Sequence, residues 1–289
     1  MIHFTATILV PNLITSSECG RRLFSLFMKY FPKHVPERVG ESEPLIRHFD
    51  LQDLGSVLEA WGHTGFIAES SNPVSVLQVR FCPPVSRNPR HSSISLLQFQ
   101  SEEVLDSEKV LGFVFEVSEN FSADYASAHI LTRTELENRM AMIESRPAAP
   151  PQASGKQTVV HLRKRIEKEG FAAVLTSMRN GNHTVGLRRC LPGLSWLTVF
   201  GAAYVQLFGR KKLLSAPAIG VRELSNGAIG IRLTERLNDS QDDWDRFEIV
   251  RKRCEQFLDS AAFFDPSLPS NHAYRVPTFR FAEITRLTY

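Results

Sequence analysis

The sequence lacks most of the features that mark a secreted, membrane-spanning or metal-binding protein. Only four of its 289 residues are cysteine, at positions 19, 82, 190 and 254, and no two of them form a C-x-x-C pair. This spacing argues against a zinc site and a disulfide framework, and it predicts buried, unpaired thiols. There is no run of about 18 apolar residues that would predict a transmembrane helix. Residues 1–10 lack a basic leader followed by a long apolar region, so they predict a first strand and a cytoplasmic protein.

The sequence also lacks a large excess of either basic or acidic residues. The 34 basic and 31 acidic residues leave a net charge of only +3, which is too balanced to predict that a whole face binds nucleic acid. A nucleic-acid-binding accessory protein remains an alternative, although no aromatic residues that could stack on bases interleave with the basic groups. These groups are Arg163-Lys-Arg165, Arg179, Arg188-Arg189 and Arg210-Lys-Lys212.

The common catalytic motifs are missing as well. The chain has no H-E-x-x-H, G-x-S-x-G, Walker A or dinucleotide-binding glycine motif in a suitable context. Its nine histidines are scattered, without a carboxylate or cysteine at ligand spacing. We therefore predict a protein that is not an enzyme and holds no cofactor or metal. A triad assembled only in space leaves an uncharacterised hydrolase as a further alternative.

The patterns that are present predict an α+β protein, in which a mainly antiparallel sheet packs with several amphipathic helices. Hydrophobic residues make up 43% of the chain and 20 residues are Phe, so we expect a large, aromatic core. Period-2 and helical spacing predict the following elements: strands over 2–10, 74–81, 94–99 and 195–200; helices capped by Thr15 and Asp50; a helix over 106–139; a helix after Asp245; and a final strand over 278–281.

A Pro- and Ala-rich stretch divides the chain. Residues 144–157 predict an exposed linker or long loop between an N-terminal half, 1–143, and a C-terminal half, 158–289. One sheet that draws strands from both halves would instead make a single continuous domain. In the C-terminal half, residues 158–179 are ambiguous but favour a helix.

Two segments of the C-terminal half allow more detailed predictions. In the hairpin over 218–234, hydrophobic register favours a three-residue loop that pairs Leu224 with Ala228 and leaves Gly227 left-handed. Residues 195–200 predict a strand buried on both faces; Gly201 then breaks the strand, and a short helix follows that Gly209 stops.

This last stretch also carries a resemblance. Leu191-Pro-Gly-Leu-Ser-Trp-Leu-Thr-Val-Phe-Gly201 resembles the core of bacterial immunity proteins of polymorphic toxin and type VI secretion systems, most closely the immunity protein 52 family. Supporting matches are Tyr204-Val-Gln-Leu-Phe-Gly209, Leu213-Leu-Ser-Ala-Pro-Ala218, Glu43-Pro-Leu45, Asp242-Asp-Trp244, Ala262-Phe-Phe-Asp265 and Arg275-Val-Pro-Thr-Phe279. The resemblance implies an α+β protein that binds and neutralises a toxin encoded by a neighbouring gene, typically a nuclease with a restriction-endonuclease-like fold.

Acidic clusters are the candidate toxin contacts. The DNA groove of a nuclease is basic, so an inhibitor that occludes it should present carboxylates. Two groups qualify, with Trp244 as a possible anchor: Glu37, Glu41 and Glu43, and Asp239, Asp242, Asp243 and Asp245. Capping of a helix N-terminus is the alternative explanation for the second group.

Overall fold

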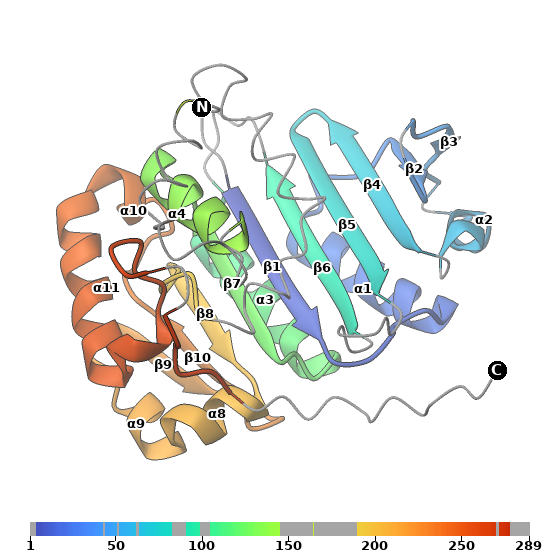
Figure 1. The fold of residues 1–289 in the computed structure, drawn as a ribbon. Coiled ribbons are helices and arrows are strands. Elements are labelled where there is room, and N and C mark those ends of the chain that lie inside the picture. Colours follow the sequence, from blue (N-terminus) through green and yellow to red (C-terminus); the bar gives the residue numbers. More distant parts are fainter. Residues whose placement is uncertain are drawn as a thin grey trace.

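A ten-stranded antiparallel sheet organises the molecule (Figure 1). The computed structural model describes residues 4–42, 44–50, 52–61, 64–82, 91–98, 105–144, 164, 190–269 and 272–277. The strand order is β3-β2-β4-β5-β6-β1-β7-β8-β10-β9, so neighbours in sequence are not always neighbours in space. The strands are β1 (Phe4–Val10), β2 (Arg38–Gly40), β3 (Arg47–His48), β4 (Gly65–Ser71), β5 (Val74–Cys82), β6 (His91–Gln98), β7 (Tyr125–Ile130), β8 (Leu197–Phe200), β9 (Gly220–Glu223) and β10 (Ile229–Arg232).

Helices cover both faces of the sheet. Helices α1 and α3 lie side by side on one face, while α4 and α11 lie on the other (Figure 1). None of the helices in the described ranges is long and apolar enough to cross a membrane. The helices are α1 (Ser17–Tyr30), α2 (Leu54–Val57), α3 (Ser107–Asn120), α4 (Arg133–Glu144), α8 (Ala202–Phe208), α9 (Arg210–Leu214), α10 (Asp239–Asp242) and α11 (Trp244–Leu258), with 3-10 turns η1 (Leu58–Ala60) and η2 (Ser260–Ala262).

The predicted α+β class and the aromatic core are confirmed. Phe113 of α3 packs edge-on against Phe27 and Phe31 of α1, with ring centroids 6.3 and 5.2 Å apart. The two helices approach closely because α3 carries Gly112 at their contact, where a Cβ atom would lie 2.4 Å from the Tyr30 ring. A glycine that weakens the helix in isolation is thus required for its packing.

The stretch over 191–214 has the predicted structure. All four residues of β8 are buried, because β7 and β10 flank the strand and helices cover it. Gly201 ends the strand and precedes α8, which Gly209 terminates with a φ of 86°. Strand β8 pairs with β7, so the sheet takes strands from both sides of the predicted linker. Residues 145–157 themselves lie outside the described residues, and the division into domains stays a prediction.

The hairpin of β9 and β10 has the predicted register. Leu224 N–H donates to the Ala228 carbonyl oxygen over 2.8 Å, and Gly227 has a φ of 80°. Val221 consequently lies opposite Ile231. Hydrophobic register therefore selected the three-residue loop correctly over the two-residue turn that Asn226-Gly227 alone would favour.

The prediction of one helix over 106–139 was wrong. Helix α3 ends at Asn120, and Ser122, with a φ of 51°, turns the chain into strand β7. Helical spacing continues through Phe121 to Tyr125, but all six residues of β7 are buried, which suits a central strand covered on both faces. The sheet therefore overrides the local helical pattern, and a separate helix, α4, follows.

Smaller corrections concern helix starts and one loop. Ser16, not Thr15, caps α1, and Asp53, not Asp50, caps the short α2. Residues 33–45, which match no helical or strand pattern in the sequence, contain strand β2, which pairs with β3 and β4. Two predicted elements fall outside the described residues: the helix over 158–179, apart from Lys164, and the strand over 278–281.

Candidate functional site

The two acidic groups singled out from the sequence lie far apart. Glu37 and Glu41 flank β2 near one edge of the sheet, whereas the aspartates lie on α10 and α11 near the opposite end (Figure 1). Glu37 accepts hydrogen bonds from the Ser71 hydroxyl at 2.5 and 2.7 Å, and these bonds lower its pKa. Glu41 accepts from the backbone N–H and hydroxyl of Thr64, at 2.9 and 3.0 Å. Both carboxylates thus anchor chain segments around β4, and Glu43 lies outside the described residues.

The aspartates near α11 divide into engaged and free side chains. Asp239 forms an ion pair with Arg236 at 3.1 Å, and Asp243 caps α11 by accepting from the Arg246 N–H at 3.3 Å. Asp242 and Asp245 are exposed, and neither carboxylate has a hydrogen bond or ion pair within the described ranges. The capping explanation therefore applies to Asp243, while Asp242 and Asp245 remain available to a partner.

Trp244 is not a free anchor. Its ring packs against Phe247, with centroids 6.0 Å apart, and the guanidinium of Arg251 lies 5.4 Å from its ring centroid. The side chain is partly buried against the hydrophobic core. Any contact between Trp244 and a partner would therefore involve only its exposed edge.

Behind α11 lies a buried polar network that the sequence motifs did not reveal. His129 of β7 lies 2.6 Å from Glu135 of α4, and Arg251 of α11 reaches the same carboxylate oxygen at 3.0 Å. Glu248 forms a second ion pair with Arg251. His129 and Glu135 are six residues apart, but one lies on a strand and the other on the helix that follows, so neither helical nor ligand spacing predicts their contact.

The geometry fixes the tautomer of His129. Its Nδ1 accepts the Trp196 N–H at 3.2 Å, so Nε2 carries the proton and donates it to Glu135. Burial lowers the pKa of His129, although Glu135 opposes this shift. Both ring nitrogens are engaged, Phe247 stacks on the ring, and the side chain is 1% exposed. The network therefore clamps α4 and α11 onto the sheet, and it offers no open position for a substrate.

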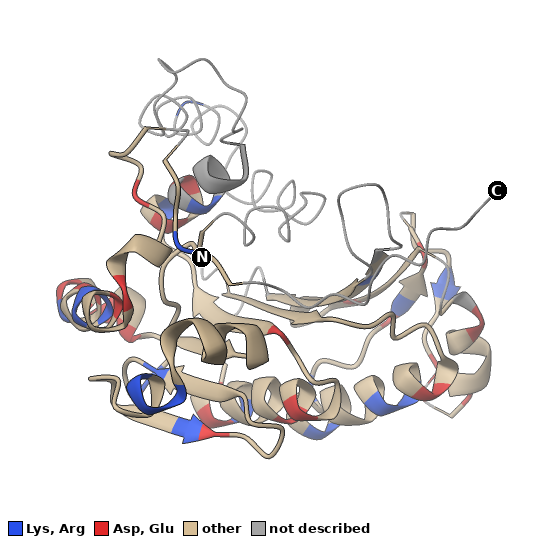
Figure 2. Ribbon diagram, turned by 60° about the horizontal axis from the view of Figure 1, so that its bottom comes forward, with Lys and Arg blue, Asp and Glu red and all other residues tan. Residues whose placement is uncertain are grey.

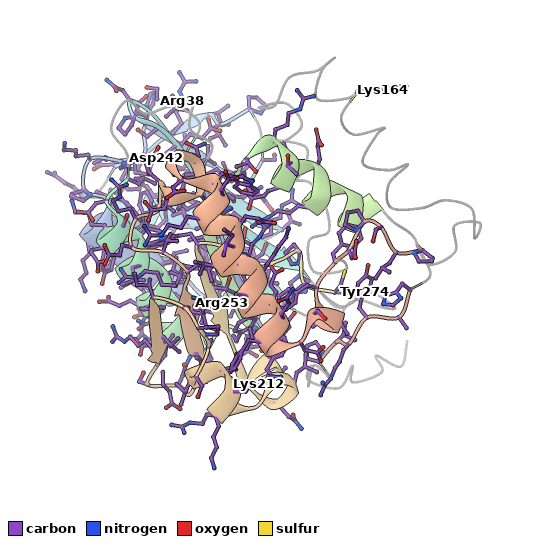
Figure 3. The ribbon with its side chains drawn as sticks, turned by 90° about the vertical axis from the view of Figure 1, so that its left-hand side faces the viewer. Arg38, Lys164, Lys212, Asp242, Arg253 and Tyr274 are labelled. Carbon is purple, nitrogen blue, oxygen red and sulfur yellow. The ribbon has the colours of Figure 1, made fainter. Side chains whose placement is uncertain are left out.

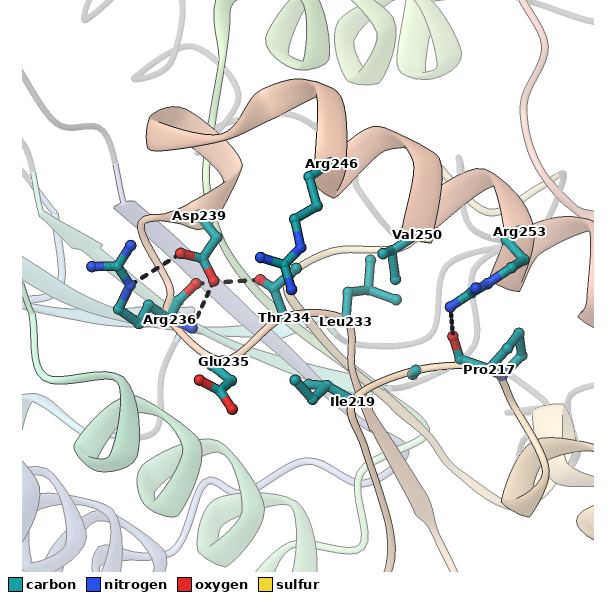
Figure 4. Close-up of a pocket in the computed structure, with 11 residues that line it drawn as sticks. Pro217, Ile219, Leu233, Thr234, Glu235, Arg236, Asp239, Arg246, Val250 and Arg253 are labelled. Atoms are coloured by element: carbon teal, nitrogen blue, oxygen red, sulfur yellow. Dashed lines mark hydrogen bonds and ion pairs between the residues drawn. The ribbon is translucent and has the colours of Figure 1, made fainter.

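A groove lies in front of α11. It has a volume of about 620 Å³ and runs between the β9–β10 hairpin and helices α10 and α11 (Figure 4). We call it the arginine groove, because Arg236, Arg246 and Arg253 line it. One side consists of residues 217–219, before β9, and 233–236, after β10; the helix side consists of Asp239, Arg246, Val250 and Arg253.

Exposed apolar side chains gather around this groove. Among the described residues, five large hydrophobic side chains are exposed, and three of them belong to this sector: Ile219 in the groove, and Ile249 and Phe257 on α11. Ile249 is 67% exposed and lies on the outer side of the helix. Figure 3 views this side, on which α11 crosses the front of the molecule, with Asp242 of α10 near its start and Arg253 farther along it. Free carboxylates, arginines and apolar groups thus share one surface.

Other proposed chemistry finds less support in the geometry. Of the basic groups, Arg210 pairs with Glu223, and Lys211 and Lys212 are exposed on α9; the groups over 163–189 lie outside the described residues, apart from Lys164. Figure 2 shows basic and acidic residues interspersed along the described helices. No three His, Cys, Asp or Glu side chains in the described part of the chain converge as metal ligands.

Comparisons with known proteins show a likeness of fold. No family model matches the chain, and no curated protein matches it in sequence. A solved structure, the Pseudomonas aeruginosa T6SS protein PA0821, is similar with a TM-score of 0.50 and 13% sequence identity. The likeness covers 89% of this chain and 83% of that one. At this identity the two proteins share a fold, and the likeness extends over most of both chains.

Proposed function

We propose that this chain is a cytoplasmic immunity protein that binds and neutralises an antibacterial toxin encoded beside it. The fold shared with a T6SS protein over most of both chains carries this proposal, and it supports the resemblance of residues 191–218 to immunity proteins. Immunity proteins act as binders, so no catalytic machinery is required. The toxin that the sequence resemblance favours is a nuclease with a restriction-endonuclease-like fold.

The surface around α10 and α11 is the proposed contact. Asp242 and Asp245 are exposed carboxylates without partners among the described residues, and Ile249 lies one helical turn after Asp245. Carboxylates beside an apolar group suit a basic protein surface, because charge steers the encounter while apolar burial holds the complex. Glu37 and Glu41 are less suited, since their hydrogen bonds to the protein itself already engage them.

Co-expression tests the function directly. We expect the chain to rescue cells from the product of the neighbouring gene and to co-purify with it. Neither rescue nor co-purification with any adjacent product would refute the proposal. In the complex, Asp242→Lys/Asp245→Lys should weaken binding at least about tenfold, since each reversal turns a charge attraction into a repulsion.

The control is Glu18→Lys. Glu18 is exposed in the first turn of α1, as Asp245 is in the first turn of α11, so both reversals remove a favourable interaction with a helix N-terminus. Helix α1 covers a different face of the sheet from α11. We expect the Glu18→Lys variant to rescue cells from the toxin as well as the wild type does. Equal loss in both variants would mean that helix destabilisation, not contact, explains the effect.

A further inference from the structure

Two of the three arginines in the arginine groove have no carboxylate partner among the described residues. Arg236 is paired with Asp239, and Arg253 donates one hydrogen bond to the Pro217 carbonyl oxygen at 3.0 Å (Figure 4). The guanidinium of Arg246 forms no hydrogen bond or ion pair with the described residues. A guanidinium has five N–H donors, so Arg246 and Arg253 retain most of their hydrogen-bonding capacity.

Apolar side chains line part of the groove, together with Thr234, Glu235 and Asp239. Leu233 is buried, Val250 is partly buried, and Ile219 is 48% exposed. Arg246, Val250 and Arg253 follow one another at helical spacing of four and three residues, so they lie along one side of α11. An open apolar strip between two arginines suits an extended segment of another protein better than a small molecule, which binds in more enclosed sites.

The types of side chain in the groove favour an acidic peptide over a nucleic acid. Guanidinium groups bind carboxylates in a bidentate manner, and two of them spaced along a helix would match acidic side chains on one segment. Nucleic acid is disfavoured because none of the described residues that line the groove is an aromatic on which a base could stack.

We infer that the arginine groove docks an acidic segment of the partner protein, with carboxylates on Arg246 and Arg253 and an apolar side chain against Ile219 and Val250. The inference rests on the proposed function for the identity of that partner. It also predicts how charges are arranged on the partner: a basic region faces Asp242 and Asp245, and a neighbouring acidic segment faces Arg246 and Arg253.

A labelled peptide tests the groove without the toxin. The probe is a fluorescein-labelled ten-residue peptide with four Glu and two Leu, titrated at low ionic strength and followed by fluorescence anisotropy. We expect the wild type to bind this peptide. The same peptide with Gln in place of Glu should bind the wild type at least about tenfold more weakly, and the Glu peptide should bind Arg246→Glu/Arg253→Glu more weakly by a similar factor. Lys211→Glu/Lys212→Glu makes the same charge change on α9, outside the groove, and should bind within about twofold of the wild type.

Three outcomes would overturn the inference: equal binding of both peptides, unchanged binding by the groove variant, or tighter binding of a thymidine oligonucleotide than of the Glu peptide. Arg246→Ala, which removes an exposed and unpaired side chain, repeats the test if the charge reversal does not fold. With the toxin itself, full co-purification of the groove variant would also refute this inference while leaving the proposed function intact. Absence of co-purification by the wild type would refute the proposed function alone, because the peptide titration still tests the groove.

Discussion

Arg251 provides a sharp test of the buried network. Its side chain is 15% exposed, and it pairs with Glu135, whose side chain is 5% exposed, and with Glu248. The substitution Arg251→Met keeps an unbranched stem against Trp244 but removes the charge. This leaves Glu135 without its cation, whereas Glu248 keeps an ion pair with Lys252 at 3.3 Å. Breaking a buried ion pair costs about 3–5 kcal/mol. Glu135 keeps hydrogen bonds to His129 and Thr132, so we expect a loss near the lower limit, about 3 kcal/mol.

The pH dependence of this loss tests its electrostatic origin. Burial alone would raise the pKa of Glu135, but His129, Arg251 and Thr132 outweigh it and lower the pKa from 4.5 to about 2. In the wild type the stabilisation from the ionised carboxylate is therefore present above pH 4.5 and is lost as the pH falls toward 2. Without Arg251 the folded-state pKa should rise, so that Glu135 takes up a proton in mild acid. The stability gap between variant and wild type should then narrow by at least about half between pH 7 and pH 4.5.

Urea unfolding followed by far-UV circular dichroism measures both quantities without relying on Trp244 fluorescence. The matched control is Arg246→Met on the same helix, which removes an exposed, unpaired arginine and should change stability by less than about 0.5 kcal/mol. A loss below about 1 kcal/mol for Arg251→Met would refute the assigned role of the network. If Arg251→Met lowers the free energy of unfolding by the same large amount at both pH values, the loss comes from packing and not from charge.

Two further predictions concern the junction of β7 and β8. A Cβ atom on Gly201 would lie 2.3 Å from the Ala123 carbonyl oxygen, so Gly201→Ala should lower the free energy of unfolding in urea by about 2 kcal/mol or more. The control is Gly220→Ala, whose nearest contact is 3.4 Å and which should cost less than about 1 kcal/mol; similar losses in the two variants would contradict the clash. Burial raises the pKa of Asp124 from 3.8 to about 6, so its folded form binds a proton more tightly and stability falls as the pH rises between these values. Asp124→Asn should therefore flatten the stability profile from pH 4 to pH 7 by up to about 3 kcal/mol, and an unchanged slope would show that another group titrates there.

Local sequence signals predicted the second half of the sheet well. Gly201 and Gly209 bound α8 as expected, because a residue that ends a strand or a helix acts through its own backbone conformation and immediate neighbours. The hairpin register followed from the alternation of apolar residues around Gly227. Both cases depend on interactions within a few residues, which a sequence displays directly.

The same kind of reasoning failed for β7. Helical spacing runs through Phe121 to Tyr125, yet the chain forms a central strand between β1 and β8. Both neighbours are far from β7 in the sequence, one before it and one after it, so the hydrogen bonds that select the strand are not visible in the local pattern. For the candidate site, the sequence identified the acidic residues near α11. It did not show which of them form hydrogen bonds or ion pairs within the protein. Asp243 caps the helix and Asp239 pairs with Arg236, while Asp242 and Asp245 have no partner among the described residues.

The sequence by itself determined the α+β class, the aromatic core and the turns, because these follow from periodicity and from the backbone preferences of single residues. Only the tertiary structure decided which distant charges meet. Glu135 and Arg251 are 116 residues apart, and the arginine groove combines the hairpin with α11. Such contacts depend on the order of strands in the sheet and on which helix covers which face, so the acidic, basic and apolar groups of one surface come together only in the folded chain.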